Sequence, residues 1–142
     1  MPTRSMADTV SEAIRSFRQY TPDYVASGLV DMSTGLLLGV DTLDGHPQEI
    51  LEVLAAATVD LFQGRNVVMI EDIWRQRRGT GADDLHYFQE VLVNSTNLVH
   101  LFMRSAANAD MVAVVVCRRT VNVGMLFAQA RIVLREMDAA LR

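Results

Sequence analysis

The sequence contains a single cysteine, Cys117, among 142 residues. One cysteine excludes an internal disulfide, and its place within an apolar run predicts a buried, unreactive thiol. A chain without disulfides is typical of a reducing compartment, so we expect a cytoplasmic protein. The first residues carry charges where an export signal would have an apolar core, so no export signal is predicted.

Long apolar runs and aromatic residues are also scarce. Half of the residues are apolar, yet no stretch reaches the roughly 18 uninterrupted apolar residues that a membrane span requires. Aromatic residues make up 6% and the net charge is −4, so we expect no nucleic-acid partner. At this length the chain, 1–142, is most simply one domain with a core that needs no metal or disulfide.

Motifs for nucleotide, metal or covalent chemistry are missing as well. The sequence has no Gly-x-x-x-x-Gly-Lys-Ser loop, no Gly-x-Gly-x-x-Gly, no Cys-x-x-Cys and no His-Glu-x-x-His. The three histidines are scattered over a predicted helix start and two predicted strands: His46, His86 and His100. We therefore expect no cofactor, no metal site and no catalytic residue, and do not expect an enzyme.

The strongest pattern that is present lies near the C-terminus. Residues Met111 to Cys117 form an unbroken apolar run rich in β-branched side chains, which is typical of a strand covered on both faces. Asn122 follows and can cap a helix. The helix is predicted from apolar residues at spacings of three and four: Val123, Leu126, Phe127, Ala130, Val133, Leu134, Met137 and Leu141.

The preceding elements complete a mixed helix and strand pattern. A short amphipathic helix is predicted at 7–20, and two strands at 24–31 and 36–40 are joined by a turn containing Gly35. Within this hairpin, Gly28 and Gly39 indicate a bulge or the close approach of a helix. Two further strands are predicted at 86–93 and 98–104.

The middle of the chain predicts a long helix whose apolar side is unusually wide. Ile50, Leu54, Ala57 and Leu61 form one stripe, and a second stripe lies beside it. This arc is wider than one sheet face explains. We expect the helix to continue through 64–78 with a bend at Gly64.

Two short motifs and this order of elements resemble the roadblock/LC7 family over Met6 to Leu141. The first motif is Gly28-Leu-Val-Asp-Met-Ser-Thr-Gly-Leu-Leu-Leu in the hairpin, and the second is Thr120-Val-Asn-Val-Gly-Met-Leu at the start of the last helix. The chain departs from the family where Phe127 and Gln129 stand in place of an arginine. It also has a long, arginine-rich stretch at 64–84.

The resemblance implies an α+β fold of order α-β-β-α-β-β-β-α. Its five-stranded antiparallel sheet would have the long middle helix on one face and the terminal helices on the other, as in profilin-like layering. It also implies a bacterial homodimeric regulator, non-enzymatic, that acts on a Ras-like small GTPase, a motor complex or a signalling scaffold. Family members usually dimerise through the middle helix and the third strand, which here gives Ile50, Leu54, Ala57, Leu61, Tyr87, Phe88, Val91 and Val93.

A second candidate surface is the arginine group at the end of the middle helix. Trp74, Arg75, Arg77 and Arg78 could dock an acidic partner or a phosphate. The alternative is a solvated helix end at which the helix dipole favours cations.

A different class of function also fits the sequence. A PAS- or profilin-like module would hold a small molecule between a helix and the sheet. An apolar pocket with converging polar groups would distinguish it from an interaction module.

Overall fold

Residues 5–43, 48–78 and 88–141 are described by the computed structural model, with the backbone alone at 48–52 and 78. The described elements are α1 (Met6–Tyr20), β1 (Tyr24–Asp31), β2 (Leu36–Thr42), α2 (Gln48–Gln63), α3 (Arg65–Arg78), β3 (Glu90–Asn94), β4 (Leu98–Arg104), β5 (Met111–Arg118) and α4 (Val123–Leu141). The five strands form one antiparallel sheet in the order β2-β1-β5-β4-β3. The predicted fold class is confirmed.

β5 lies at the centre of the sheet and is buried on both faces, as its unbroken apolar run predicts. It pairs with β1 on one side and β4 on the other. Alternate side chains enter two separate cores. Those facing α1 and α4 are Met111, Ala113, Val115 and Cys117. Those facing α2 are Val112, Val114 and Val116.

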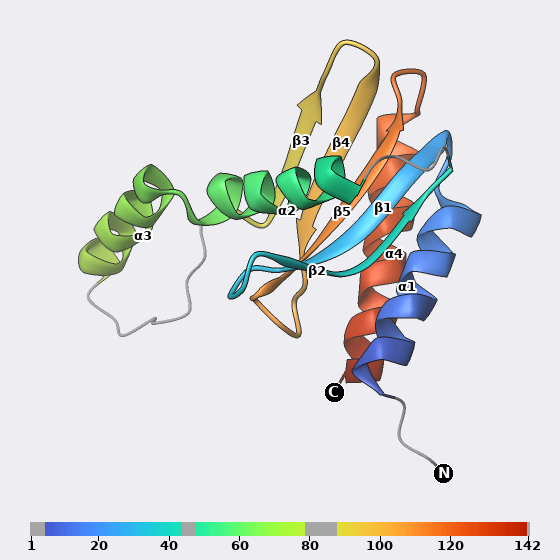
Figure 1. Cartoon of the computed structure of the whole chain (residues 1–142). Helices are drawn as coiled ribbons and strands as arrows, with labels where there is room; N and C mark the ends of the chain where they lie inside the picture. The colour runs from blue at the N-terminus through green and yellow to red at the C-terminus, as the bar shows by residue number, and fades with distance from the viewer. Residues whose placement is uncertain (1–4, 44–47, 79–87, 142) are drawn as a thin grey trace.

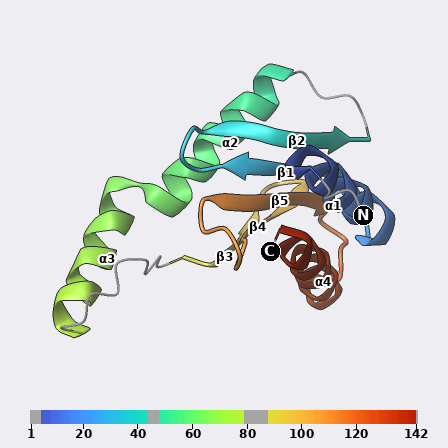
Figure 2. The same ribbon diagram turned by 90° about the horizontal axis from the view of Figure 1, so that it is seen from below.

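The helices cover the sheet unequally (Figures 1 and 2). α1 and α4 lie side by side on one face, where Phe17 and Leu126 are fully buried. α2 crosses the opposite face, where Phe62 is fully buried. Both terminal helices are capped at their N-termini: the Ser5 hydroxyl accepts a hydrogen bond from the Asp8 amide, and the side chain of Asn122, the predicted cap, accepts one from the Met125 amide.

The turn between β1 and β2 explains the polar part of the hairpin motif. Asp31 Oδ1 accepts hydrogen bonds from the Ser33 amide and hydroxyl, at 3.0 and 2.7 Å. Hydrogen bonds from Ser33, above all from its hydroxyl, lower the pKa of Asp31. Gly35 has a φ of +74°, which favours glycine at this position. The motif therefore encodes the shape of a turn.

The expected long middle helix is divided into α2 and α3 at Gly64. A Cβ atom at this position would lie 2.5 Å from the Asp60 carbonyl oxygen, so the bend requires glycine. α3 lies away from the sheet in both views (Figures 1 and 2). By length and composition alone, Val53–Arg77 is apolar enough to cross a membrane, although the apolar helices of many soluble proteins meet the same criterion.

The strand predicted at 86–93 begins later, at Glu90. Residues 86 and 87 lie outside the described part of the chain. The Phe88 carbonyl accepts a hydrogen bond from Arg104 Nε, and the Gln89 carbonyl accepts one from the Arg104 amide. In a strand continued past Glu90, the Phe88 carbonyl would face away from β4, as that of Leu92 does, and here the Arg104 side chain binds it.

Gly39 marks both features that the sequence indicated, a bulge and a close helix. The register between β1 and β2 shifts so that Leu29 pairs with Gly39 and Val30 with Leu37. A Cβ atom at Gly39 would lie 2.6 Å from a methyl group of Val10 on α1. The absence of a side chain here allows α1 to pack on β2.

We expect Gly39→Ala to reduce the free energy of unfolding by about 1–3 kcal/mol, because the added methyl group overpacks the contact with Val10. Urea unfolding followed by circular dichroism would measure the change. Gly124→Ala is the control, since the added carbon meets only the Asn122 side-chain oxygen at 3.4 Å. Equal losses in the two variants would show that the α1 contact is not the cause.

Candidate functional site

An open groove separates α2 from the edge of the sheet formed by β3 and β4. Its volume is about 480 Å³ and its lining is mainly apolar. The lining residues are Leu54, Ala57, Asp60, Leu61, Val93, Ser95, His100 and Phe102. The first four come from α2, and the last four from β3, β4 and their connecting turn.

Local periodicity places these side chains together. On α2, spacings of three and four put Leu54, Ala57 and Leu61 on one side of the helix. On the sheet, Val93 pairs with His100, and Phe102 lies two residues further along the same face of β4. The groove is thus one stripe of a helix facing one face of a hairpin.

His100 is the ionisable group on the sheet side of the groove. Its ring stacks on Phe102 with 6.5 Å between the centroids. Burial lowers the pKa of His100, so the imidazole is neutral near pH 7. Together with Asp60 and Ser95 it adds polar character to an otherwise apolar surface.

Beside the groove, β3 is the last strand of the sheet, and no other described strand pairs with its outer edge. The Ser95 amide donates to the Leu98 carbonyl, and the Arg104 amide donates to the Gln89 carbonyl, both at 2.8 Å. Since hydrogen-bonded pairs recur every second residue in an antiparallel ladder, Val91 and Val93 direct their backbone groups towards β4. The amide and carbonyl of Leu92 therefore face outward, where a further strand could pair with them.

The predicted interface residues are partly brought together by this geometry. Leu54, Ala57, Leu61 and Val93 line the groove, and Val93 is 37% exposed. Phe88 and Val91 are half-buried and pack against the core on the α2 side. The side chain of Ile50 and the whole of Tyr87 lie outside the described residues.

The predicted docking group divides between two environments. Arg75 is half-buried and bonds Asp72 at 2.8 Å within α3, while Trp74 and Arg77 are exposed. Only the backbone of Arg78 is described. Trp74 is 43% exposed.

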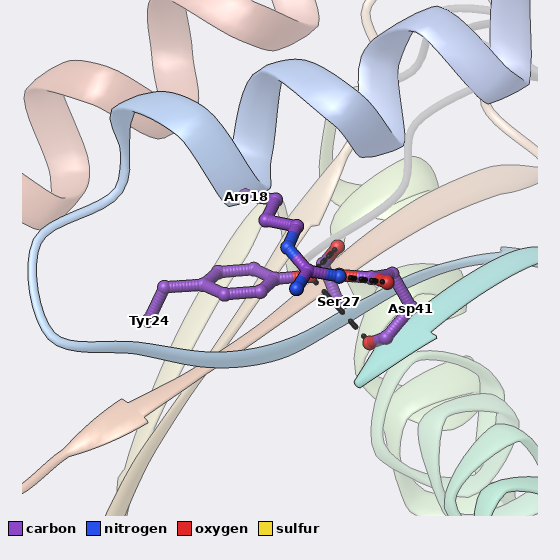
Figure 3. Close-up of polar contacts among 4 residues, drawn as sticks. All are labelled: Arg18, Tyr24, Ser27 and Asp41. Atoms are coloured by element: carbon purple, nitrogen blue, oxygen red, sulfur yellow. Dashed lines mark hydrogen bonds and ion pairs between the residues drawn. The ribbon is translucent and has the colours of Figure 1, made fainter. Parts of the chain in front are cut away.

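A polar cluster joins α1 to the first hairpin (Figure 3). The Tyr24 hydroxyl lies 2.7 Å from Asp41 Oδ2 and 2.8 Å from the Ser27 hydroxyl, and Arg18 donates to Asp41 Oδ1 at 2.9 Å. Burial raises the pKa of Tyr24 well above its ordinary value. Tyr24 is itself buried, and the cluster fastens α1 to the sheet.

Other chemistry is equally hard to place on the described surface. Burial raises the pKa of the Cys117 thiol to about 12, in line with the inert cysteine predicted from its apolar surroundings. Within residues 5–43, 48–78 and 88–141, no three histidine, cysteine or acidic side chains converge on a metal-sized site. The groove is therefore the strongest candidate for function, and its chemistry is that of an interaction surface.

Sequence reasoning missed several of these contacts. It described His100 only as one of three scattered histidines, although the alternation of His100 and Phe102 on one face was a usable signal. It did not foresee the two hydrogen bonds from Arg131 on α4 to the Glu90 carboxylate, at 3.0 and 2.8 Å, which fasten α4 to the start of β3. Sequence spacing carries no signal for pairs so far apart in the chain.

The topology and layering define the roadblock/LC7 class of α+β domains, and solved structures share them. The gliding protein MglB from Thermus thermophilus matches with a TM-score of 0.68 and 14% identity over 99% of this chain and 93% of that one. Myxococcus xanthus MglB matches with a TM-score of 0.67 and 15% identity, over 99% and 92%. A roadblock/LC7 domain from Streptomyces avermitilis matches with a TM-score of 0.60 and 16% identity, over 94% of each chain.

This chain therefore has the roadblock/LC7 fold, as its two motifs implied. No family model matches the sequence, and no curated protein matches it significantly.

We expect Tyr24→Phe to lower the free energy of unfolding by about 1 kcal/mol, because it removes the hydroxyl shared by Asp41 and Ser27. Since the folded protein holds the Tyr24 proton more tightly than the unfolded chain, wild-type stability should also fall as the pH rises above about 10. Denaturant unfolding between neutral and alkaline pH would measure both effects. The exposed Tyr20→Phe variant is the control, and an identical alkaline slope in all three proteins would contradict this role.

Proposed function

We propose that the chain is a non-enzymatic regulatory module that acts as a homodimer in a reducing, cytoplasmic compartment. Each subunit would place its α2 groove and its β3 edge against those of a second copy. The single observation that carries the proposal is the apolar groove directly beside an open strand edge.

The two features reinforce each other physically. An exposed strand edge invites pairing with another strand, and a two-fold axis beside β3 would satisfy the outward backbone groups of both copies at once. The same axis would bring apolar groove residues of α2, such as Leu54 and Leu61, towards the partner and remove them from water. An interface of this kind combines directional hydrogen bonds with apolar burial.

The open form of the groove favours a macromolecule over a small ligand. Small-molecule sites usually enclose most of the ligand surface, whereas this groove is open along the sheet edge. In the PAS- or profilin-like alternative, a small ligand would bind the polar groups of the groove, which are Asp60, Ser95 and His100. A small ligand that binds there would compete with dimer formation.

A finer part of the proposal concerns the partner of the dimer. The family resemblance implies regulators of Ras-like small GTPases, and MglB proteins share the fold. We infer that a small GTPase is the partner class. The chain has no phosphate-binding loop, so it would alter the activity of a partner and would not itself hydrolyse nucleotide.

We expect light scattering after size-exclusion chromatography to give a mass near twice 15.8 kDa for the wild type. Val93→Asp should weaken the dimer about 30-fold or more, because it buries a charge in the interface. Val40→Asp is a matched control on the opposite edge strand, since Val40 is 39% exposed and Val93 is 37% exposed. A monomeric wild type, or equal effects of the two variants, would contradict the proposed interface.

Proline substitutions on β3 test the edge more directly. Val91→Pro removes an amide that faces β4 and should destabilise the subunit by about 1–3 kcal/mol. Leu92→Pro removes an amide that faces outward, so it should weaken the dimer while the β3–β4 ladder persists. Sedimentation and circular dichroism would separate the two effects.

Leu92 also contributes its side chain to the core on the α1 and α4 side, so Leu92→Ala is the necessary control. The alanine variant loses that packing but keeps the outward amide. If Leu92→Pro dimerises as well as Leu92→Ala, β3 does not pair across the interface.

A further inference from the structure

The row of backbone groups on the outer edge of β3 is short. Leu92 directs its amide and carbonyl away from β4, and in an antiparallel ladder the same holds two positions away, at Glu90 and Asn94. Val91 and Val93 direct their backbone groups towards β4 instead. A strand that pairs with β3 from outside must therefore bond to Glu90, Leu92 and Asn94.

The Arg104 side chain blocks this row at its first end. In a strand continued past Glu90, the next outward carbonyl would be that of Phe88, and Arg104 Nε already donates to it at 3.2 Å. The guanidinium is fixed in place: Cζ lies 5.1 Å from the centroid of the Phe62 ring, and Nη1 donates to the Ala109 carbonyl. Arg104 is 6% exposed, so a partner strand would have to disrupt buried packing to displace it.

The turn after β3 ends the row at its other end. The strand stops at Asn94, and the amide and hydroxyl of Ser95 both donate to the Leu98 carbonyl, at 2.8 and 3.1 Å. Thr96 lies within this turn and does not extend the strand. The outward ladder of each subunit is therefore limited to Glu90, Leu92 and Asn94.

We propose that β3 accepts a second copy of itself in one register only, with the two-fold axis at Leu92, and that Arg104 helps to select this register. The register presupposes the proposed homodimer and specifies how its two edges meet. Leu92 then faces Leu92 of the second copy, and each Glu90 faces an Asn94. Every outward backbone group of both ladders has a partner in this arrangement.

A register with the axis at Val91 conflicts with Arg104. It would place Asn94 opposite Phe88 of the second copy, whose carbonyl already accepts the hydrogen bond from Arg104. The outward groups of Asn94 would then lack a partner strand in both subunits. Backbone groups that lose water without gaining a partner weaken an interface.

A register with the axis at Val93 fails at the other end, because Glu90 would face Thr96 in the turn. Moving the axis to Glu90 would bring the two Glu90 carboxylates opposite each other, and like charges directly opposite are destabilising. Two hydrogen bonds from Arg131, at 3.0 and 2.8 Å, hold each carboxylate at this edge. Neither register uses the full outward ladder without conflict.

Side chains also match when the axis lies at Leu92. On the face of the groove, Val91 of each subunit meets Val93 of the other, beside the apolar lining of α2. On the opposite face, Leu92 meets its own equivalent. There the Asn94 side chain lies opposite the Glu90 carboxylate, to which its amide group can donate a hydrogen bond.

Cysteine substitutions distinguish the registers. In an antiparallel ladder the closest side chains belong to pairs without mutual hydrogen bonds, which across this interface are those of Val91 and Val93. Val91→Cys faces itself only with the axis at Val91, and Val93→Cys faces itself only with the axis at Val93. An equimolar mixture of the two variants places the cysteines opposite each other only with the axis at Leu92.

We expect oxidation of the mixture to give a mixed disulfide at least about fivefold more abundant than either self-disulfide. A fusion tag on one variant would let non-reducing electrophoresis resolve the three species. Cys117 gives little background, because it is fully buried and its pKa is raised to about 12. Val91→Cys combined with Val93→Cys in one chain is the positive control, since it crosslinks with the axis at Val91, Leu92 or Val93.

Removing the Arg104 side chain tests its part in the selection. Arg104→Met eliminates the donor to the Phe88 carbonyl, so the register with the axis at Val91 gains backbone pairs. We expect the Val91→Cys self-disulfide to rise several-fold in this background. Circular dichroism would establish that the variant is folded. If it does not fold, the crosslinks in the presence of Arg104 still decide the register.

Light scattering on the same proteins separates a wrong register from a wrong dimer. A dimeric wild type with a self-disulfide as abundant as the mixed one would overturn the register and leave the dimer intact. A dimer in which the positive control does not crosslink would not pair through β3 in any of these registers. An unchanged Val91→Cys self-disulfide in folded Arg104→Met would show that Arg104 does not select the register. A monomeric wild type would contradict the proposed function itself.

Discussion

The burial of β5 on both faces is the constraint on which the rest of this structure depends. A strand whose alternate side chains are Val, Ala, Met and Cys on one face and Val on the other cannot leave either face in water without a large cost in free energy. The strand therefore needs partners at both edges, which β1 and β4 provide, and helices on both sides. The two terminal helices cover one face, and α2 covers the other.

The groove exists because helices cover the two faces of the sheet to different extents. α2 crosses the strands of its face, from Leu54 beside Leu37 of β2 to Phe62 beside Phe102 of β4. Two helices cover the first face, and α2 alone cannot cover the second. Phe62 and Phe102 close the middle of that face, and the strip beside β3 stays open. The candidate site is thus the part of the sheet that a single helix does not reach.

Local patterns in the sequence were enough to predict the sheet, because each depends on neighbours in the chain. The apolar run of β5, the Asn122 cap and the glycine at position 39 all correspond to observed features. Contacts between distant residues were not predictable in this way. The hydrogen bond from the Arg104 side chain to the Phe88 carbonyl joins residues 16 positions apart, and the polar side of the groove depends on how β4 lies against α2. Half of the predicted interface residues line that groove, because helix periodicity alone places those of α2.

The two open edges of the sheet are not equivalent, and the difference favours β3 for pairing. β2 is longer, but its register shifts at the bulge beside Gly39, and a bulge twists an edge away from a regular partner. Moreover, α1 packs directly over Gly39 and restricts approach from that face. β3 keeps an unbroken register with β4 from Glu90 to Asn94 and lies beside the groove. A strand added there would gain both backbone hydrogen bonds and apolar contact, whereas one added at β2 would meet an interrupted ladder.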